Sequence, residues 1–174
     1  MRQADSVSAD AAAAVKCDLA GEVLRSFGTL RFAATGWSML PTIWPGDTLV
    51  VERAGADQVD IGNVVLVGRD RRLCAHRVVS RAKAYGRLHW VTQGDAMPVP
   101  DRPVTEAELL GRVAYLVRAG KRIPMRAELS VIEHLIAKMV RRSFLAARVF
   151  VYLHDRARNS GKSGLKESNL PCQG

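Results

Sequence analysis

The stretch Gly36-Trp37-Ser38-Met39-Leu40-Pro41-Thr42-Ile43-Trp44-Pro45-Gly46-Asp47 is the most informative segment of the chain, because it holds a serine in a short, turn-rich segment. Pro41, Pro45 and Gly46 favour a defined bend over helix or regular strand. The Val-rich run Thr48–Glu52 follows and predicts a β-strand. A serine on a stiff bend is well placed to act as a nucleophile if the chain supplies a base. Without a base, the segment is only a turn.

The composition suits one domain with appendages. The chain has 174 residues, of which 48% are hydrophobic. Its formal net charge of +9 favours acidic partners such as anionic lipid, acidic protein or nucleic acid. Cys17, Cys74 and Cys172 include no CxxC pair, so reduced thiols are expected rather than a zinc site or a secreted disulfide framework. We expect neither a metal nor a cofactor.

The N-terminal sequence does not have the apolar core of a signal peptide, because Lys16, Asp18 and Glu22 interrupt its Ala-rich segment. No stretch reaches the roughly 18 uncharged apolar residues that span a bilayer. The longest hydrophobic helix candidate, residues 127–155, is interrupted by basic residues. The sequence therefore predicts a soluble cytoplasmic protein, or at most one that contacts an anionic membrane surface through residues 127–155.

Periodicity and turn residues divide the chain into five segments. Residues 1–9 are predicted to be disordered, and residues 10–28 to form a helix that Gly28 ends. Residues 29–124 are predicted to form a mainly β domain. Residues 125–157 match a long amphipathic basic helix. Residues 158–174, rich in Gly, Ser and Lys, read as a disordered tail. Within the β domain, strands are expected near residues 30–34, 48–52, 63–68, 73–81, 88–92 and 111–117.

Among the four histidines, His76 is the best candidate for a base. It lies on the strand predicted to return after an Arg-rich hairpin tip, and a strand holds a side chain more precisely than a loop does. His89 reads as a solvent-facing strand residue, and His134 and His154 belong to the basic helix. An imidazole accepts a serine proton near neutral pH.

The loop at residues 93–103 offers two carboxylates that could orient such a histidine. Asp95 follows a glycine directly after a strand, and Asp101 lies among prolines. A carboxylate fixes the imidazole tautomer and balances the imidazolium. Either aspartate alone would usually be a turn residue, so the residues themselves leave both choices open.

Three segments together resemble the signal peptidase I family. Residues 36–47 resemble its nucleophile box, approximately G/S-x-S-M-x-P-T-x-x-x-G-D. His76-Arg77-Val78-Val79 is similar to its base-bearing strand, where most bacterial members and the related LexA-type repressors have lysine and the endoplasmic-reticulum type has histidine. Residues 92–96, with Asp101 after them, are similar to that type's T-K-G-D-x-N…D segment. The resemblance covers about residues 30–118.

The resemblance implies a mainly β fold, a coiled sheet of the signal-peptidase/LexA kind, with an N-terminal helix and a long C-terminal amphipathic helix. It implies a serine endopeptidase that acts through an acyl-enzyme on Ser38, with His76 as base. Asp95 is the first choice for the orienting carboxylate and Asp101 the second. Backbone N–H groups near Ser38 would hold the oxyanion. Gly36 and Met39 would border the oxyanion and the substrate, a peptide or protein with small residues at the cleavage point.

Two departures from the family pattern bear on this interpretation. Signal peptidases carry a membrane-spanning helix before the serine box, whereas a helix of soluble character is expected at residues 10–27. Family members commonly have Asn two residues after the Asp of the third box, and Met97 occupies that position here. Delivery of substrate at a membrane is therefore not implied by this chain.

Two further functions compete with the peptidase. A LexA-like regulator would cleave itself before the serine box, where Ala20-Gly21 is the available site, inside the predicted helix. A non-catalytic adaptor would use the basic helix at residues 127–155 to bind membrane, nucleic acid or a protein partner, with nucleic acid the least favoured. The simplest interpretation of that helix is packing on the domain with a solvated basic face.

Overall fold

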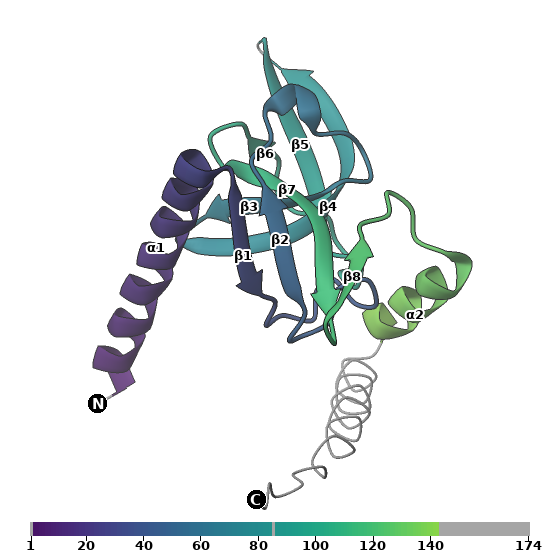
Figure 1. Ribbon diagram of the computed structural model, residues 1–174, viewed down its shortest axis with the longest axis horizontal. Helices are drawn as coiled ribbons and strands as arrows, with labels where there is room; N and C mark the ends of the chain where they lie inside the picture. The colour runs from purple at the N-terminus through teal and green to yellow at the C-terminus, as the bar shows by residue number, and fades with distance from the viewer. Residues whose placement is uncertain (1, 85, 143–174) are drawn as a thin grey trace, which may run out of the picture.

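An antiparallel β-sheet dominates the computed structural model, which describes residues 2–84 and 86–142 (Figure 1). This confirms the mainly β prediction. The strands are β1 (Thr29–Ala33), β2 (Thr48–Glu52), β3 (Val64–Arg69), β4 (Arg72–Ala84), β5 (Arg87–Gln93), β6 (Val104–Thr105), β7 (Leu109–Arg118) and β8 (Lys121–Pro124). Two α-helices, α1 (Arg2–Phe27) and α2 (Val131–Arg142), and the short 3-10 helix η1 (Ala56–Gln58) complete the described elements.

The order of strands leaves two edges that matter for the site. Within the described residues the sheet runs β1-β2-β7-β3-β4-β5-β6, and β8 pairs with β7. β4 pairs with β3 along Arg72–Arg77 and with β5 only from Arg77 onward. The segment from Arg72 to His76 therefore has one edge without a strand partner in the described chain, and so does β1. A coiled sheet brings both edges to the side on which α1 lies (Figure 1).

The β3–β4 hairpin is closed by a two-residue turn. Asp70 and Arg71 both have positive φ angles, 50° and 61°. Positive φ at both central positions is the type I′ pattern, whose twist matches that of the flanking strands. The turn places Arg71 at the hairpin tip and Arg72 as the first residue of β4.

One hydrophobic cluster lies between the curled sheet and α1, and a second, which includes Val65, Val78 and Trp90, contains none of the described residues of α1. Leu24 of α1 is 1% exposed and packs with strand residues that alternate toward the same side. Burying a leucine of this kind is worth about 1.5–3 kcal/mol. The cluster also receives Met39 and Ile43 from the serine turn. The turn is thereby anchored in the core, which fixes the backbone on both sides of Ser38.

Helix α2 packs on the outer side of the serine turn. Val140 is buried against Leu40 and Ala96, and Ile136 packs at the edge of this cluster. A capping box starts the helix: the Glu133 carboxylate accepts a hydrogen bond from the N–H of Ser130 (2.7 Å), and the Ser130 hydroxyl accepts one from the N–H of Glu133 (3.3 Å).

The structure corrects several expected boundaries. The first helix begins at Arg2, so the prediction of disorder at residues 1–9 is wrong from residue 2 onward. The helix extends toward the N-terminus from the alanine run at residues 11–14, because adding residues to an existing helix costs less than starting one. The second helix begins at Val131 and not at residue 125, because the capping box sets its start. Strands β6 and β8 were not predicted. Residues 143–157 of the expected helix and the expected tail at 158–174 lie outside the described residues.

Within residues 2–84 and 86–142, no helix combines the length and the apolar character that crossing a bilayer requires.

Candidate active site

Ser38 and His76 come together although 38 positions separate them in the sequence. Ser38 lies in the turn after β1, and His76 lies on β4. The Oγ atom of Ser38 is 3.0 Å from Nε2 of His76. His76 is 6% exposed, so neighbouring atoms hold its ring in one orientation. The predicted nucleophile and base are therefore within hydrogen-bond reach of each other.

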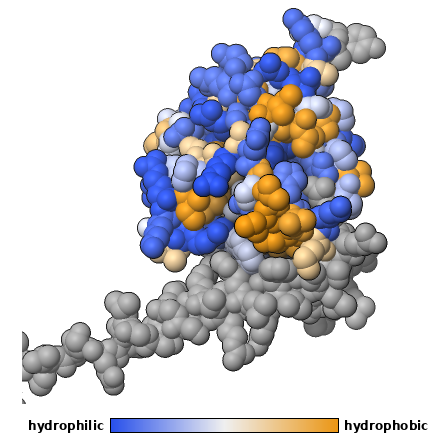
Figure 2. Space-filling model, turned by 90° about the vertical axis from the view of Figure 1, so that its right-hand side faces the viewer, coloured by the Kyte–Doolittle hydropathy of each residue, from blue (hydrophilic) through white to orange (hydrophobic). Residues whose placement is uncertain are grey.

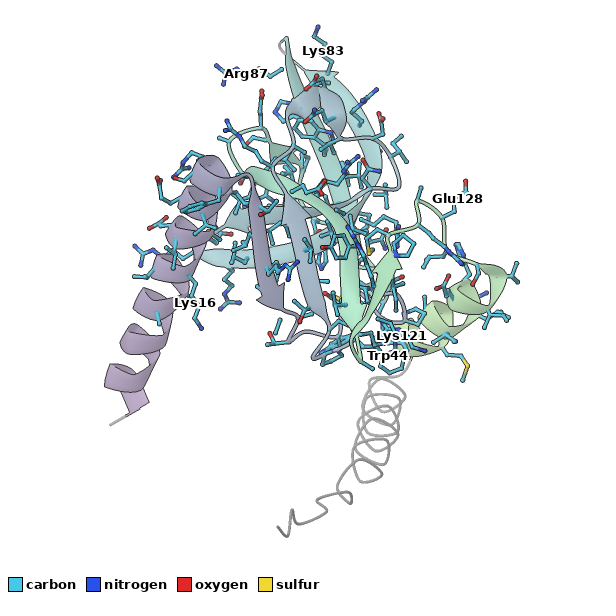
Figure 3. All side chains as sticks on the ribbon, viewed as in Figure 1. Lys16, Trp44, Lys83, Arg87, Lys121 and Glu128 are labelled. Atoms are coloured by element: carbon cyan, nitrogen blue, oxygen red, sulfur yellow. The ribbon has the colours of Figure 1, made fainter. Side chains whose placement is uncertain are left out.

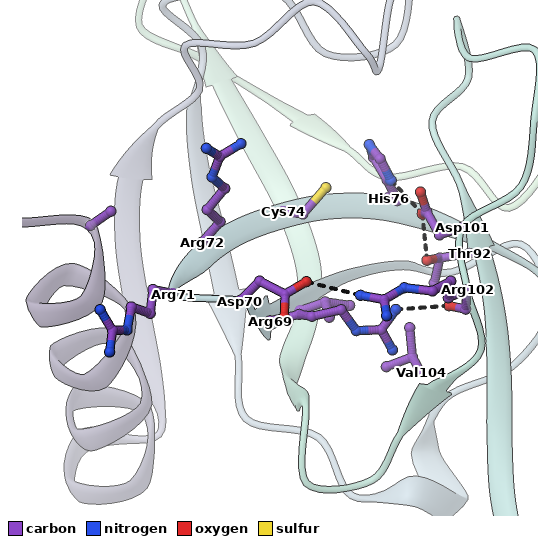
Figure 4. Close-up of a pocket in the computed structure, with 12 residues that line it drawn as sticks. Arg69, Asp70, Arg71, Arg72, Cys74, His76, Thr92, Asp101, Arg102 and Val104 are labelled. Atoms are coloured by element: carbon purple, nitrogen blue, oxygen red, sulfur yellow. Dashed lines mark hydrogen bonds and ion pairs between the residues drawn. The ribbon is translucent and has the colours of Figure 1, made fainter. Parts of the chain in front are cut away.

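Asp101 occupies the other side of the imidazole ring. Its Oδ2 atom is 2.6 Å from Nδ1 of His76 and 2.7 Å from the hydroxyl of Thr92, which donates to it (Figure 4). The backbone also ties the two segments together, since the N–H of Asp101 donates to the carbonyl of Thr92 at 2.7 Å. The loop that carries Asp101 is thus fastened to β5 directly beside His76.

The contacts determine which ring nitrogen carries the proton. An ionised carboxylate only accepts hydrogen bonds, so Nδ1 of His76 must be the donor to Asp101. The lone pair of Nε2 then faces the Ser38 hydroxyl at 3.0 Å. This tautomer is the one that accepts a proton from serine.

Asp95 was the first choice for the orienting carboxylate, but it pairs with Arg77 and not with His76. This preference is wrong. Nε and Nη2 of Arg77 donate to Oδ1 and Oδ2 of Asp95 at 2.8 and 2.9 Å. The side chains of Asp95 and Arg77 are only 3% and 9% exposed. His76 and Arg77 are adjacent on β4, and side chains alternate along a strand, so the two carboxylates serve opposite faces of β4.

The Arg77–Asp95 pair also fastens the serine turn. The hydroxyl of Thr42, four residues after Ser38, donates to Asp95. The carbonyl of Ser38 accepts a hydrogen bond from the N–H of Ala96 at 2.8 Å. Arg77 further donates to the carbonyls of Gly62 (2.9 Å) and Arg126 (2.7 Å), besides Ala127. One buried ion pair therefore connects the serine turn, β4 and the segment before α2.

A second ion pair, between the buried Asp47 and the half-buried Arg118, anchors the far end of the turn. Asp47 is 0% exposed and receives hydrogen bonds from Nε and Nη2 of Arg118 at 2.9 and 2.7 Å. The same Nη2 donates to the carbonyl of Thr42 at 3.0 Å, and the N–H of Trp44 donates to Asp47 at 2.7 Å. Both ends of the turn are thus held by charged hydrogen bonds, which favours a single position for Ser38.

Gly94 makes room for the contact between serine and histidine. A Cβ atom at this position would lie 2.6 Å from the carbonyl oxygen of Ser38 and 3.0 Å from Nε2 of His76. Both distances are shorter than ordinary van der Waals contacts. A side chain at residue 94 would therefore push the nucleophile and the base apart.

Gly36 and Met39 line the groove in front of Ser38. A Cβ atom at Gly36 would meet nothing within 4 Å, so the space beside the serine is open. The side chain of Met39 is buried in the core, although it also borders the groove. Within the described chain, the backbone N–H groups of Ser38 and Met39 donate to no other group. These two donors are available to an oxyanion.

Cys74 lies on the same face of β4 as His76, two residues before it (Figure 4). Burial, with a smaller contribution from the negative charge of Asp101, raises the pKa of its thiol to about 11. A thiol with this pKa is almost entirely protonated near neutral pH and is a weak nucleophile. Ser38 is the candidate nucleophile because its Oγ atom lies 3.0 Å from Nε2 of His76.

The remaining histidines lie elsewhere. His89 is half-buried on β5 and its Nδ1 is 3.3 Å from the carbonyl of Arg87, while His134 is exposed on α2. His154 lies outside the described residues. In the part of the chain that the structure describes, no three His, Cys, Asp or Glu side chains gather into a possible metal site.

Sequence reasoning missed the residues that support the site: Thr42, Arg77, Thr92, Gly94 and Arg118. One signal was available, because Arg77 precedes Val78 and Val79 in a predicted strand, and an arginine that a strand buries usually has a charged partner. The others acquire their function only through contacts between segments distant in the sequence.

No family model matches this chain, and neither the curated proteins nor the solved structures include a significant match.

Proposed function

We propose that this protein is a serine endopeptidase that cleaves a peptide or protein through Ser38, His76 and Asp101. The observation that carries the proposal is the continuous line of hydrogen-bond distances from Ser38 Oγ to His76 Nε2 (3.0 Å) and from His76 Nδ1 to Asp101 (2.6 Å). A serine, a base and an orienting carboxylate in this order form the arrangement that activates serine for acyl transfer.

The chemistry proceeds in two steps. Ser38 Oγ attacks the scissile carbonyl carbon while His76 Nε2 accepts its proton, and Asp101 balances the imidazolium. The backbone N–H groups of Ser38 and Met39 hold the oxyanion. The C–N bond then breaks, and His76 returns the proton to the leaving amine. In the second step His76 deprotonates water, which attacks the ester, and Ser38 regains its proton.

A groove suited to an extended peptide supports the proposal. It has a volume of about 580 Å³, it runs from Ser38 between β1 and the first residues of β4, and α1 forms its wall. The strand edges on both sides lack partners in the described residues, so each offers backbone donors and acceptors to an added strand. Small side chains at Ala33, Ala34 and Ala75 leave space near the serine.

The resemblance to signal peptidase I points to the same function. Its three segments, brought close together here, carry the serine, the histidine and the loop with Asp101. We extend the proposal to the fold, a coiled sheet of the signal-peptidase/LexA kind, and to substrates with small residues at the cleavage point. His76 rather than lysine as the base corresponds to the endoplasmic-reticulum type of that family.

The self-cleaving alternative has less support. Ala20 and Gly21 are both buried and lie inside α1. A peptide bond in a helix must unwind before it fits an extended groove, so the structure favours another chain as the substrate.

Helix α2 exposes a stripe of large apolar side chains, which favours a second property of the protein. Val131, Ile132, Leu135 and Met139 are 58–78% exposed, and Lys138 is exposed among them. Figure 2 shows hydrophobic side chains on the face that carries this helix. We propose that this stripe rests on an anionic membrane surface, as basic amphipathic helices do.

The peptidase proposal is tested by cleavage of a complex peptide mixture, read by mass spectrometry. We expect the wild type to cleave next to small residues, and Ser38→Ala and His76→Ala to leave the mixture intact. The same cleavage pattern in all three proteins would refute the proposal, because the activity would then come from a contaminant or another site.

The membrane proposal is tested by flotation with vesicles of phosphatidylglycerol and with vesicles of phosphatidylcholine alone. Leu135→Glu is expected to reduce binding to the anionic vesicles by about tenfold or more, since it puts a negative charge where an exposed leucine would enter the lipid. Ile61→Glu changes a residue that is also 60% exposed but lies away from α2, and is the matched control. Equal binding of all three proteins would refute the proposal.

A further inference from the structure

The far end of the groove is positively charged. The lining of this 580 Å³ groove includes Lys16, Arg71 and Arg72 and contains no Asp or Glu. All three side chains are exposed. An extended peptide that starts at Ser38 therefore passes apolar walls first and reaches cations at the hairpin tip.

Two neighbouring arginines, Arg69 and Arg102, have carboxylate partners, whereas Arg71 and Arg72 have none among the described side chains. Arg69 pairs with Glu108 at 2.6 Å, and Arg102 pairs with Asp70 at 2.9 Å. Among the side chains that the structure describes, those of residues 12–83 and 86–140, Arg71 and Arg72 make no ion pair with a carboxylate. The groove thus carries an uncompensated positive charge at a defined place.

A second hollow, of about 600 Å³, adjoins the groove across β4 and reaches His76 and Asp101. Arg71 and Arg72 line both spaces. In Figure 4, the side chains of Arg72, Cys74 and His76 project from β4 toward the same side. A peptide that lies along β4 next to His76 would thus reach the guanidinium of Arg72.

The strand geometry sets the spacing. Arg72 is four residues from His76 on β4, and a strand rises about 3.3 Å per residue. A peptide added alongside β4 advances at the same rate, so the side chain that meets Arg72 lies about four residues from the scissile bond. A carboxylate there receives charge-assisted hydrogen bonds from a planar, permanently charged guanidinium.

We infer that Arg72, assisted by Arg71, makes the groove select extended peptides with an acidic side chain about four residues from the scissile bond. This inference rests on the proposed function for the position of that bond, but the preference for an acidic peptide is a property of the groove alone. It assigns a specificity-determining role to the hairpin tip.

The test measures binding without cleavage. Full-length protein with Ser38→Ala is titrated into short fluorescent Ala- and Val-rich peptides in which a single Glu, or Gln as its neutral counterpart, is moved along the sequence. We expect the Glu peptide to bind about 5–10-fold more tightly than the Gln peptide at one register. Adding Arg72→Glu should remove this preference and favour the matching Lys peptide.

Arg87→Glu is the matched control, since it makes the same charge change at the tip of the β4–β5 hairpin, outside the groove (Figure 3). It should keep the Glu preference. Equal binding of Glu and Gln peptides at every register, or equal effects of Arg72→Glu and Arg87→Glu, would overturn the inference. Displacement of the Glu peptide by a DNA oligonucleotide at equal charge concentration would also overturn it, because the site would then bind any polyanion.

The two proposals fail in different ways. If the wild type cleaves no peptide but the Glu preference reverses with Arg72→Glu, the peptidase proposal falls and the inference about the groove stands. If the wild type cleaves Glu and Gln peptides equally well and they bind equally, the inference falls and the peptidase proposal stands.

Discussion

Two matched substitutions, Asp101→Asn and Asp95→Asn, are expected to separate turnover from stability. Both remove a negative charge and keep the shape of the side chain. Asp101 contacts His76 and its side chain is 34% exposed, whereas Asp95 is 3% exposed and pairs with Arg77. The account therefore predicts that the first change affects the reaction and the second affects the fold.

The magnitudes follow from these environments. Asp101→Asn leaves a partly hydrated site, so the free energy of unfolding should change by less than about 1 kcal/mol. It loses the acceptor that sets the tautomer of His76, so kcat should fall by about 10²–10⁴-fold. Asp95→Asn leaves the guanidinium of Arg77 buried without a counter-charge, which costs about 3–5 kcal/mol. For a chain of this size, the expected drop in Tm is roughly 6–20 °C.

The assays are thermal unfolding and peptide turnover, measured on both variants and the wild type well below the lowest Tm. Asp95→Asn should keep clearly more turnover than Asp101→Asn, although its unfolding temperature is lower. The reasoning is refuted if Asp101→Asn turns over at the wild-type rate while Asp95→Asn is inactive with an unchanged Tm. That result would move the orienting function to Asp95.

Three further predictions concern single groups near the site. Gly94→Ala should lower kcat by about 10–100-fold, because its Cβ would displace the nucleophile by a fraction of an ångström; wild-type turnover would contradict this. Arg69 lowers the pKa of Glu108 to about 2, so this carboxylate stabilises the fold above its ordinary pKa of 4.5 and loses that effect as the pH falls toward 2. Acid unfolding should therefore remove more stability from the wild type than from Glu108→Gln between those pH values, and parallel curves would refute the pairing. With its pKa raised to about 11, the Cys74 thiol should react with iodoacetamide at pH 8 about 100-fold more slowly in the native than in the urea-unfolded protein, as measured by peptide mass spectrometry; equal rates would show that the thiol is not buried.

The elements that depend on local sequence were predictable. The run Thr48–Glu52 forms β2 as expected, and the Arg-rich tip between β3 and β4 is a tight turn. Alternating apolar residues and turn residues encode both features locally. Ser38 and His76 were predicted as nucleophile and base mainly from the resemblance of their segments to a known family, and the structure brings their side chains to hydrogen-bond distance.

The third member of the site was not predictable from the residues. Asp95 and Asp101 lie in one loop, and both follow patterns that suit a turn. The choice between them depends on Arg77. It binds Asp95 on one face of β4, and His76 contacts Asp101 on the other face. Such pairings join positions distant in the sequence, and periodicity carries no information about them.

The start of α2 illustrates a different limit. Apolar periodicity from residue 125 predicted a helix there, but residues 125–130 are not helical, and the N–H of Met125 donates to the carbonyl of Ala114 on β7. The Ser130–Glu133 capping box then begins the helix at Val131. A sequence search for capping boxes would have found this boundary.

The central claim is that Ser38, activated by His76, forms a covalent acyl intermediate. The most direct measurement is acid quenching of the protein during turnover of a cleaved peptide, followed by intact-mass analysis and peptide mapping. The account predicts an added acyl mass on Ser38 that is absent in Ser38→Ala and strongly reduced in His76→Ala. An adduct on another residue, or peptide cleavage that persists in Ser38→Ala, would contradict the account.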